Sequence, residues 1–139
     1  MKKLFVFLLA VFAFNLTYAQ EGAPKKEEAK GPVITFAEAS HNFGDIAQGD
    51  KIDYKFKFKN TGTEPLILSN VLTQCGCTAT DWNKEPIAPG KSGEIAVTFN
   101  SAGKSGAQNK IVTVVSNATN SQERVKISAN VLPKKDGNL

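Results

Sequence analysis

Residues 52–59 read Ile52-Asp53-Tyr54-Lys55-Phe56-Lys57-Phe58-Lys59, an alternation of apolar and charged side chains. Successive side chains of a β-strand point to opposite faces. The stretch therefore predicts a strand whose inner face takes the four apolar residues and whose outer face takes the charged ones. We expect the three lysines to face solvent, where they keep an exposed strand from pairing with neighbours. Contact with an anionic surface is the alternative.

The same alternation recurs at residues 95–99 and 125–131, whereas residues 111–115 are apolar on both faces. A strand of the latter kind is expected to be covered on both sides. Turn residues such as Asn60-Thr61-Gly62 and Pro89-Gly90 separate these runs. Shorter strands are expected at residues 33–36, 41–46, 65–73 and 77–82.

These short strands, with a turn after each of them, predict an all-β fold. We expect an immunoglobulin-like antiparallel β-sandwich of about seven strands with Greek-key connections. A small barrel is the alternative, because counting strands does not separate the two architectures.

The first residues have the layout of a secretory signal peptide. Lys2 and Lys3 precede an unbroken apolar run of 11 residues, 4–14, and small residues follow. We expect residues 1–19 to be removed by cleavage between Ala19 and Gln20. The run is shorter than the ~20 residues that span a membrane, so we do not expect it to be a transmembrane helix. No later segment is long and apolar enough to span a membrane, so we expect no transmembrane segment in the mature chain. The protein is then exported, to the periplasm or the cell exterior.

Residues 20–31 lack any bulky apolar side chain and mix charges of both signs, which predicts a flexible linker. The tail, 134–139, is interpreted in the same way. Residues 32–133 then form a single domain of ordinary size. The net charge of +4 falls to +2 when Lys2 and Lys3 are removed. So small a charge gives no reason to expect binding to nucleic acid.

The only two cysteines are Cys75 and Cys77, on either side of Gly76. In a straight strand the Cα atoms of residues two apart lie ~6.6 Å from each other. The Cβ atoms have a similar spacing, whereas a disulfide needs them ~3.5–4.5 Å apart. A bond therefore requires Gly76 to adopt a positive φ or a tight bend. So small a ring stabilises the fold little. We favour a local structural role, as a disulfide or as two packed thiols.

Other chemistries of Cys75 and Cys77 stay open. Thiolates are ligands for Cu(I) or zinc, but a tetrahedral zinc site would also need His41 and a carboxylate such as Asp81. Thiol–disulfide exchange usually has two residues between the cysteines, in a strand–helix context. Bridging to another chain is the last possibility. The two cysteines are thus candidates for binding a metal, but no metal site is predicted from them. We expect no cofactor.

The remaining candidate residues have ordinary structural interpretations. His41 is expected at the surface or partly packed, and Trp82 as core or edge packing rather than as a sugar-binding platform. Asn117-Ala118-Thr119 is a glycosylation sequon that we interpret as a polar turn. No nucleophile and base stand together in the sequence. We therefore expect a protein that is not an enzyme.

Several motifs in a fixed order resemble a bacterial family. They are His41-Asn42-Phe43-Gly44-Asp45-Ile46, residues 56–62, Pro65-Leu66, Cys75-Gly76-Cys77-Thr78, residues 87–90 and Gly93-Glu94-Ile95. The chain resembles the domain-of-unknown-function 1573 family over residues 36–131. The resemblance implies an immunoglobulin-like sandwich, similar to major sperm protein and ciliary ASH domains, in an exported protein of the Bacteroidetes type. It implies no activity.

Two functions agree with these observations. The first is a non-catalytic interaction or scaffold module that binds an unknown protein partner of the cell envelope through strand edges and loops. The alternative is a thiol-based copper or redox accessory protein that uses Cys75 and Cys77.

Overall fold

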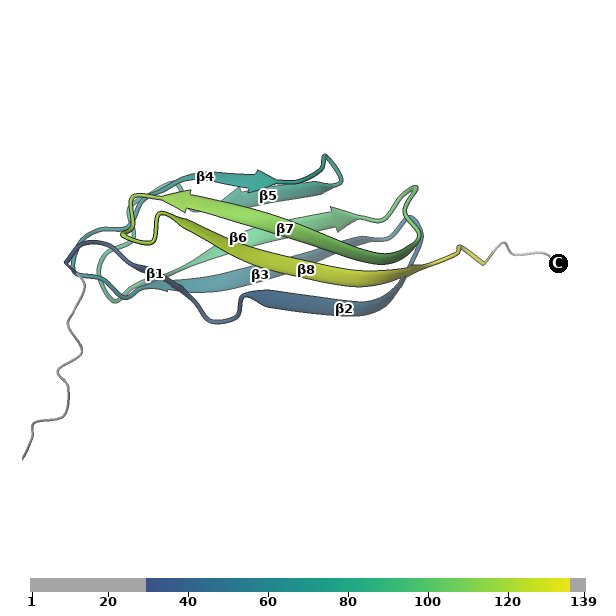
Figure 1. Ribbon diagram of the computed structural model, residues 1–139, viewed down its shortest axis with the longest axis horizontal. Coiled ribbons are helices and arrows are strands. Elements are labelled where there is room, and N and C mark those ends of the chain that lie inside the picture. Colours follow the sequence, from purple (N-terminus) through teal and green to yellow (C-terminus); the bar gives the residue numbers. More distant parts are fainter. Residues whose placement is uncertain (1–29, 136–139) are drawn as a thin grey trace, which may run out of the picture.

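The protein folds into eight β-strands, shown in the computed structural model of Figure 1, which describes residues 30–135. The predicted signal peptide, its predicted cleavage site and most of the predicted linker and tail lie outside the described residues. Within them no helix is long and apolar enough to cross a membrane. The strands are β1 (Ile34–Phe36), β2 (Ser40–Ala47), β3 (Lys51–Asn60), β4 (Leu68–Thr73), β5 (Thr78–Trp82), β6 (Ser92–Asn100), β7 (Gly106–Ser116) and β8 (Gln122–Leu132).

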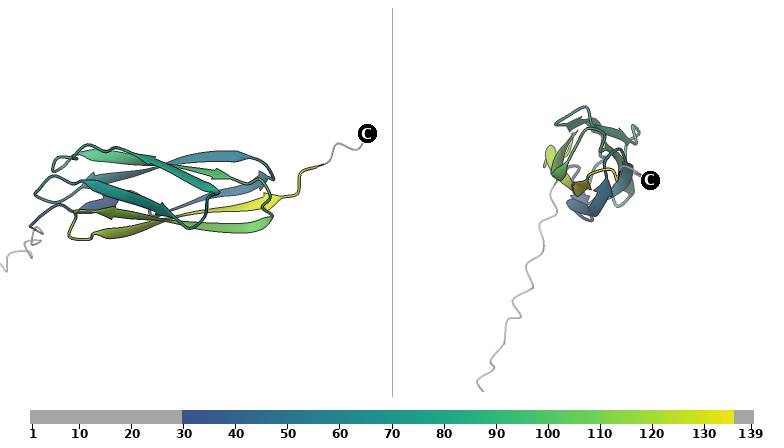
Figure 2. Two further views of the ribbon diagram at one scale, coloured as in Figure 1. Left: turned by 90° about the horizontal axis from the view of Figure 1, so that it is seen from above. Right: turned by 90° about the vertical axis from the view of Figure 1, so that its right-hand side faces the viewer.

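Two four-stranded sheets face each other, and Figure 2 shows them as separate layers. The first sheet has the order β1-β3-β6-β5, and the second has the order β2-β8-β7-β4. This is the arrangement of constant-type immunoglobulin domains, with β2 added beside β8. The expected immunoglobulin-like sandwich is confirmed, and the small barrel is wrong. The Greek-key connections stay a prediction.

One strand pair departs from the expected antiparallel arrangement. β2 runs parallel to β8, with His41 opposite Ile127 and Ile46 opposite Val131. The cause is the short link at residues 37–39, which takes the chain from the first sheet to the second between β1 and β2. Because of this crossing, the first part of the domain forms two edge strands, β1 in the first sheet and β2 in the second. The fold therefore has eight strands rather than about seven.

The core lies between the sheets and follows the alternation of β3. Phe56 and Phe58 are fully buried, while Ile52 and Tyr54 pack half-buried at the margin. Burying a large apolar side chain contributes ~1.5–3 kcal/mol to folding. The second sheet contributes alternate residues of β7 and β8 to the same core. The buried residues of these strands and of β6 are Ile95, Val97, Phe99, Val112, Val114, Val125, Ile127, Ala129 and Val131.

The expectation that β7 is covered on both faces is wrong. Val112 and Val114 face the core, but Ile111, Thr113 and Val115 point to the outside of the second sheet. Their half-burial comes from neighbours within that sheet, because no described residue forms a layer over it. A strand with apolar residues on both faces is therefore left with one face open to solvent.

A buried amide joins the loops at one end of the sandwich. Asn60 is fully buried at the end of β3. Its Nδ2 donates hydrogen bonds to the carbonyl oxygens of Glu64, at 2.7 Å, and Ile87, at 2.8 Å. Its Oδ1 accepts from the main-chain N–H of Gly62 at 3.0 Å and of Val33 at 3.4 Å. One side chain thus satisfies main-chain groups of three separate segments.

Candidate functional site

The two cysteines lie in the turn between β4 and β5, which crosses from one sheet to the other. The structure joins Cys75 to Cys77 as a disulfide, with Cα atoms 5.3 Å apart. The N–H of Thr78 donates to the carbonyl oxygen of Cys75 at 3.3 Å, which closes the turn. Both cysteines are half-buried. The oxidation state of this pair in the cell stays a prediction.

Gly76 permits this turn in an ordinary conformation. It is not among the glycines with positive φ, and a Cβ placed on it would meet nothing within 4 Å. Of the two conformations expected for a bond, the tight bend is found and the positive φ is not. The shortened Cα distance therefore comes from the turn itself, outside any strand.

The structure does not bring the other proposed metal ligands to the cysteines. Within residues 30–135 no three side chains of His, Cys, Asp or Glu are placed to hold one metal ion. His41 lies on β2 in the second sheet, while Asp81 is exposed on β5 in the first. A four-ligand zinc site of His41, Asp81 and the two cysteines is therefore not formed.

His41 belongs instead to a small cluster of aromatic and acidic groups at the crossing between the sheets. Its ring stacks on Tyr54 with centroids 3.7 Å apart, and Phe43 meets it edge-on at 4.7 Å. Nδ1 of His41 lies 3.2 Å from Oε1 of Glu38. The hydrogen bond to Glu38, followed by burial and the charge of that carboxylate, raises the pKa of Tyr54 above its usual range. The cluster thus joins β2 of the second sheet to β3 of the first through side-chain contacts.

Trp82 and the lysine row lie as expected. Trp82 packs half-buried against the core at the edge of the first sheet, and Nζ of Lys84 sits 2.7 Å from the centroid of its ring. Its buried Nε1 has no hydrogen-bond partner among the described residues. Lys55, Lys57 and Lys59 are all exposed. Trp82 is thus edge packing whose ring is covered by a lysine.

Asn117 of the sequon has a structural role that the sequence did not reveal. Its Oδ1 accepts from the N–H of Ile67 at 2.7 Å, and its Nδ2 donates to the carbonyl oxygen of Pro65 at 3.1 Å. Asn120, three residues on, holds Ile34 in the same two-sided way. The turn between β7 and β8 therefore clamps segments of both sheets, which a polar sequence alone does not disclose.

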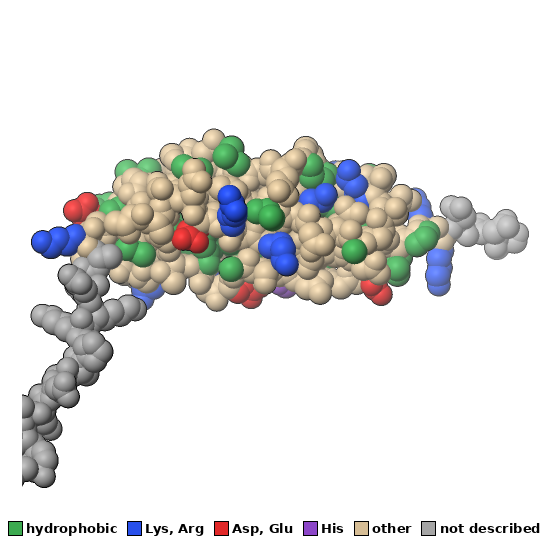
Figure 3. Space-filling model, viewed as in Figure 1, with side chains coloured by type: hydrophobic (Ala, Val, Ile, Leu, Met, Phe, Trp, Pro, Cys, Tyr) green, Lys and Arg blue, Asp and Glu red, His purple; other side chains and the backbone are tan. Residues whose placement is uncertain are grey.

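The exposed apolar side chains of the second sheet form the clearest candidate contact surface. Leu72 on β4 is 50% exposed, and Ile67 just before β4 is 41% exposed. On β7, Val115 lies opposite Asn70, and Thr113 opposite Leu72. Figure 3 shows hydrophobic side chains in the upper part of this face, over β4 and β7. We call Ile67, Leu72, Ile111 and Val115 the apolar strip.

The apolar strip borders an open sheet edge. β4 pairs with β7 on one side, and no described strand pairs with its other side. The two-sided apolar pattern of residues 111–115 predicted a strand covered on both faces, not an open surface. Such a pattern does not distinguish a strand covered by its own domain from one left open.

Comparison with solved structures identifies the fold. A protein of unknown function from Porphyromonas gingivalis W83 superimposes with a TM-score of 0.64 at 18% identity. The match covers 74% of this chain and 48% of that protein, so the chain spans about half of its length. The ASH/PapD-like domain 7 of human CEP192 has a TM-score of 0.62 at 9% identity, covering 76% of this chain and 89% of that one.

A third similar structure is the secreted serine protease VesC of Vibrio cholerae. Its TM-score is 0.57 at 13% identity, and the match covers 71% of this chain but only 23% of the protease. At such identities the three structures show a shared fold. The ASH/PapD-like domain among them confirms the expected likeness to ASH domains.

Sequence comparison places the chain in a family. No curated protein matches it. Residues 34–131 match the family described as "Protein of unknown function (DUF1573)", which agrees with the resemblance over residues 36–131. Because the match covers most of the sequence and its structure has the expected sandwich, the chain belongs to the DUF1573 family.

Proposed function

We propose that this chain is an exported, non-catalytic interaction module that binds a protein partner of the cell envelope. The observation that carries the proposal is the apolar strip on the outer face of the second sheet. Exposed apolar patches on soluble domains mark contact surfaces, because leaving them in water is unfavourable. Its most exposed residue, Leu72, lies at the open edge of β4, where a partner can also reach main-chain groups.

The fold shared with an ASH/PapD-like domain supports a binding role. Such a fold does not decide function by itself. The layout of residues 1–19 supports export.

The partner contact is tested by cross-linking in the living cell. A photo-reactive amino acid at position 67, within the apolar strip, should give a specific cross-linked protein, and adding Leu72→Ser should abolish recovery of that protein. Leu132 offers a matched control, since it is also an exposed leucine, at 44%, at the end of β8 and away from the strip. If Leu72→Ser and Leu132→Ser both leave recovery of the cross-linked protein unchanged, the apolar strip is not the interface.

Export is tested separately by cell fractionation and N-terminal sequencing. We expect the protein outside the cytoplasm with Gln20 as its first residue. A cytoplasmic protein that keeps residues 1–19 would contradict the envelope role while leaving the contact surface to be judged by cross-linking.

A thiol-based copper or redox role is the second candidate, and the position of the cysteine turn favours it. Both cysteines are half-buried residues, and Oγ1 of Thr78 lies 3.9 Å from each of their sulfurs. A hydroxyl so placed can donate to a thiolate. Titration of the reduced protein with Cu(I) against a competing chelator tests this role, with the Cys75→Ser/Cys77→Ser variant as control. Equal copper uptake by both proteins would exclude it.

A further inference from the structure

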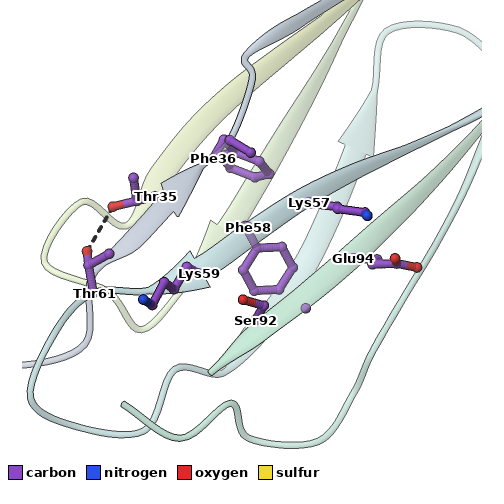
Figure 4. A pocket seen from close by; sticks show the side chains of 10 residues that line it. Thr35, Phe36, Lys57, Phe58, Lys59, Thr61, Ser92 and Glu94 are labelled. Atoms are coloured by element: carbon purple, nitrogen blue, oxygen red, sulfur yellow. Dashed lines mark hydrogen bonds between the residues drawn. The ribbon is translucent and has the colours of Figure 1, made fainter. Parts of the chain in front are cut away.

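An open hollow of about 800 Å³ lies on the first sheet, over β1, β3 and β6. Ten residues line it, and Figure 4 shows eight of them labelled. The half-buried ring of Phe36 supplies apolar lining, and it packs on the buried ring of Phe58 with centroids 5.8 Å apart. Lys57 and Lys59 of β3 stand at its margin. The hollow is on the sheet opposite to the apolar strip, so it is a separate surface.

The hollow exists because two features leave space beside β3. β1 pairs with β3 only as far as Phe36, and the N–H of Ala37 makes the last hydrogen bond, 3.0 Å to the carbonyl oxygen of Lys57. On the other side Gly93 pairs with Phe58 and has no side chain. A Cβ at Gly93 would lie 2.5 Å from Cζ of Phe58, so the ring occupies the place that a side chain would take.

The margin of the hollow carries positive charge that the described residues do not neutralise. Neither Lys57 nor Lys59 has a carboxylate within 4.0 Å among residues 30–135. The one acidic residue that lines the hollow, Glu94, is paired with Lys55 at 3.2 Å. Hydroxyl groups of Thr35 and Thr61, 2.8 Å apart, lie on the same side as Lys59 (Figure 4). Two free ammonium groups and these hydroxyls suit an anionic group.

The edge of β3 beside the hollow is open to another strand. In an antiparallel pair, every second residue directs its N–H and C=O toward the same neighbour. Since Lys57 uses its carbonyl oxygen toward Ala37, the next residues facing this edge are Lys55 and Asp53. Beyond Ala37 no described strand pairs with this side of β3. An extended segment can therefore continue the line of β1 along β3.

We propose that the hollow and the open edge of β3 bind an extended acidic segment of a partner protein. The segment adds a strand next to Asp53 and Lys55 in line with β1. At its end nearest β1 it reaches the hollow, where its alternate acidic residues share the outer face of the sheet with Lys57 and Lys59. The residues between them are apolar and contact Phe36, since Phe58 beneath it is buried. Charge complementarity selects this occupant, because main-chain pairing gives affinity while the side-chain pattern gives specificity.

The test uses the chain from Gln20 onward and a synthetic peptide, Glu-Val-Glu-Val-Glu-Val-Glu, blocked at both ends. Backbone amide signals in NMR spectra report where the peptide binds. We expect shifts at Ala37, Asp53 and Lys55, new protection of the Lys55 amide from hydrogen exchange, and weaker binding at higher salt. A Lys-Val peptide of the same length should bind at least tenfold more weakly.

Charge variants decide whether the hollow is responsible. Lys57→Glu/Lys59→Glu should weaken binding of the acidic peptide at least tenfold. Arg124→Glu/Lys126→Glu changes the net charge equally, at exposed positions of β8 in the other sheet, and should change binding less than twofold. Equal losses in both variants, or shifts confined to other strands, would overturn the proposal.

Sequence order and other occupants are separated by three further measurements. A peptide of the same composition with its glutamates and valines in two blocks should bind at least fivefold more weakly, and equal binding would show charge attraction alone. Saturation by inorganic phosphate with the same shifts would also overturn the proposal. A third result would overturn it as well: a Lys55 amide that is protected from hydrogen exchange in the free chain and loses this protection in Glu27→Gln/Glu28→Gln. The chain's own residues would then occupy the site.

Discussion

Nδ2 of Asn60 donates a hydrogen bond of 2.8 Å to the carbonyl oxygen of Ile87, 27 residues later in the chain. The same buried amide also bonds to Glu64, Gly62 and Val33. Asn60→Ala removes all four bonds and leaves buried main-chain groups without partners. At ~1–3 kcal/mol for an unsatisfied buried group, we expect a loss of roughly 3 kcal/mol or more in the free energy of unfolding, measured by urea denaturation.

Asn109 is the matched control for that substitution. It is an exposed asparagine on β7 for which the structure records no side-chain hydrogen bond. Asn109→Ala should change the free energy of unfolding by no more than ~0.5 kcal/mol, as surface substitutions usually do. Similar losses in the two variants would show that the Asn60 network does not hold the loops together.

Gly93 and Gly76 should respond differently to substitution by alanine. At Gly93 the added Cβ would lie 2.5 Å from the buried ring of Phe58. Removing a glycine from a strand gains ~0.5–1 kcal/mol, but overpacking a core costs ~1–3 kcal/mol, so the clash decides the sign. We expect Gly93→Ala to lower the thermal midpoint and Gly76→Ala, which meets nothing within 4 Å, to leave it nearly unchanged. Two unchanged midpoints would contradict the close packing at Gly93.

Tyr54 should titrate above an ordinary tyrosine. Its neutral phenol donates to Glu38, and the carboxylate raises its pKa. Because the pKa is higher in the folded than in the unfolded chain, this contribution to stability is complete below pH ~10. It is lost as pH rises through the folded pKa. Tyr54 is the only tyrosine from Gln20 onward, so phenolate absorbance measures it alone.

Glu38→Gln should lower the pKa of Tyr54 toward its usual range, since it removes the charge beside the phenol. Glu85→Gln, at an exposed position in the segment after β5, loses the same charge and should have no effect. An unchanged titration in Glu38→Gln would mean that this carboxylate does not contact Tyr54 in solution.

The cysteine bridge should contribute little to stability. It closes a loop across one intervening residue, and the loop-entropy relation gives no more than ~2 kcal/mol for so short a loop. Reductant should therefore shift urea unfolding only slightly, and Cys75→Ser/Cys77→Ser should not respond to it. Mass spectrometry after alkylation without reductant should find both sulfurs unmodified. Full alkylation of both would refute the bridge.

The strands could be predicted from the sequence because burial imposes a period of two on each of them. Phe56 and Phe58 are buried and the lysines between them are exposed, as the alternation of β3 indicates. Alternation carries no information on which strand lies alongside or in which direction it runs. The parallel pairing of β2 with β8 depends on the crossing at residues 37–39, and no local sequence pattern predicts this crossing.

The side-chain network and the candidate surfaces were harder to predict for a similar reason. Asn60 and Asn117 read as turn residues, yet their side chains bond to segments 27 and 50 residues away. The two-sided apolar pattern of residues 111–115 was visible in the sequence. However, a strand covered by its own domain and a strand that contacts a partner both carry apolar side chains on both faces. The hollow depends on where β1 ends relative to Gly93, which is a relation between three strands.

The parallel pair of β2 and β8 also has a mechanical consequence. β1 begins at one end of the long axis and β8 ends at the other, as Figure 1 shows. If the chain is anchored through one end and pulled through the other, the load runs along these strands. The bonds between β2 and β8 are then sheared together rather than opened one at a time. Pulling single molecules by their ends should therefore give one high-force rupture, and gradual yielding at low force would contradict it.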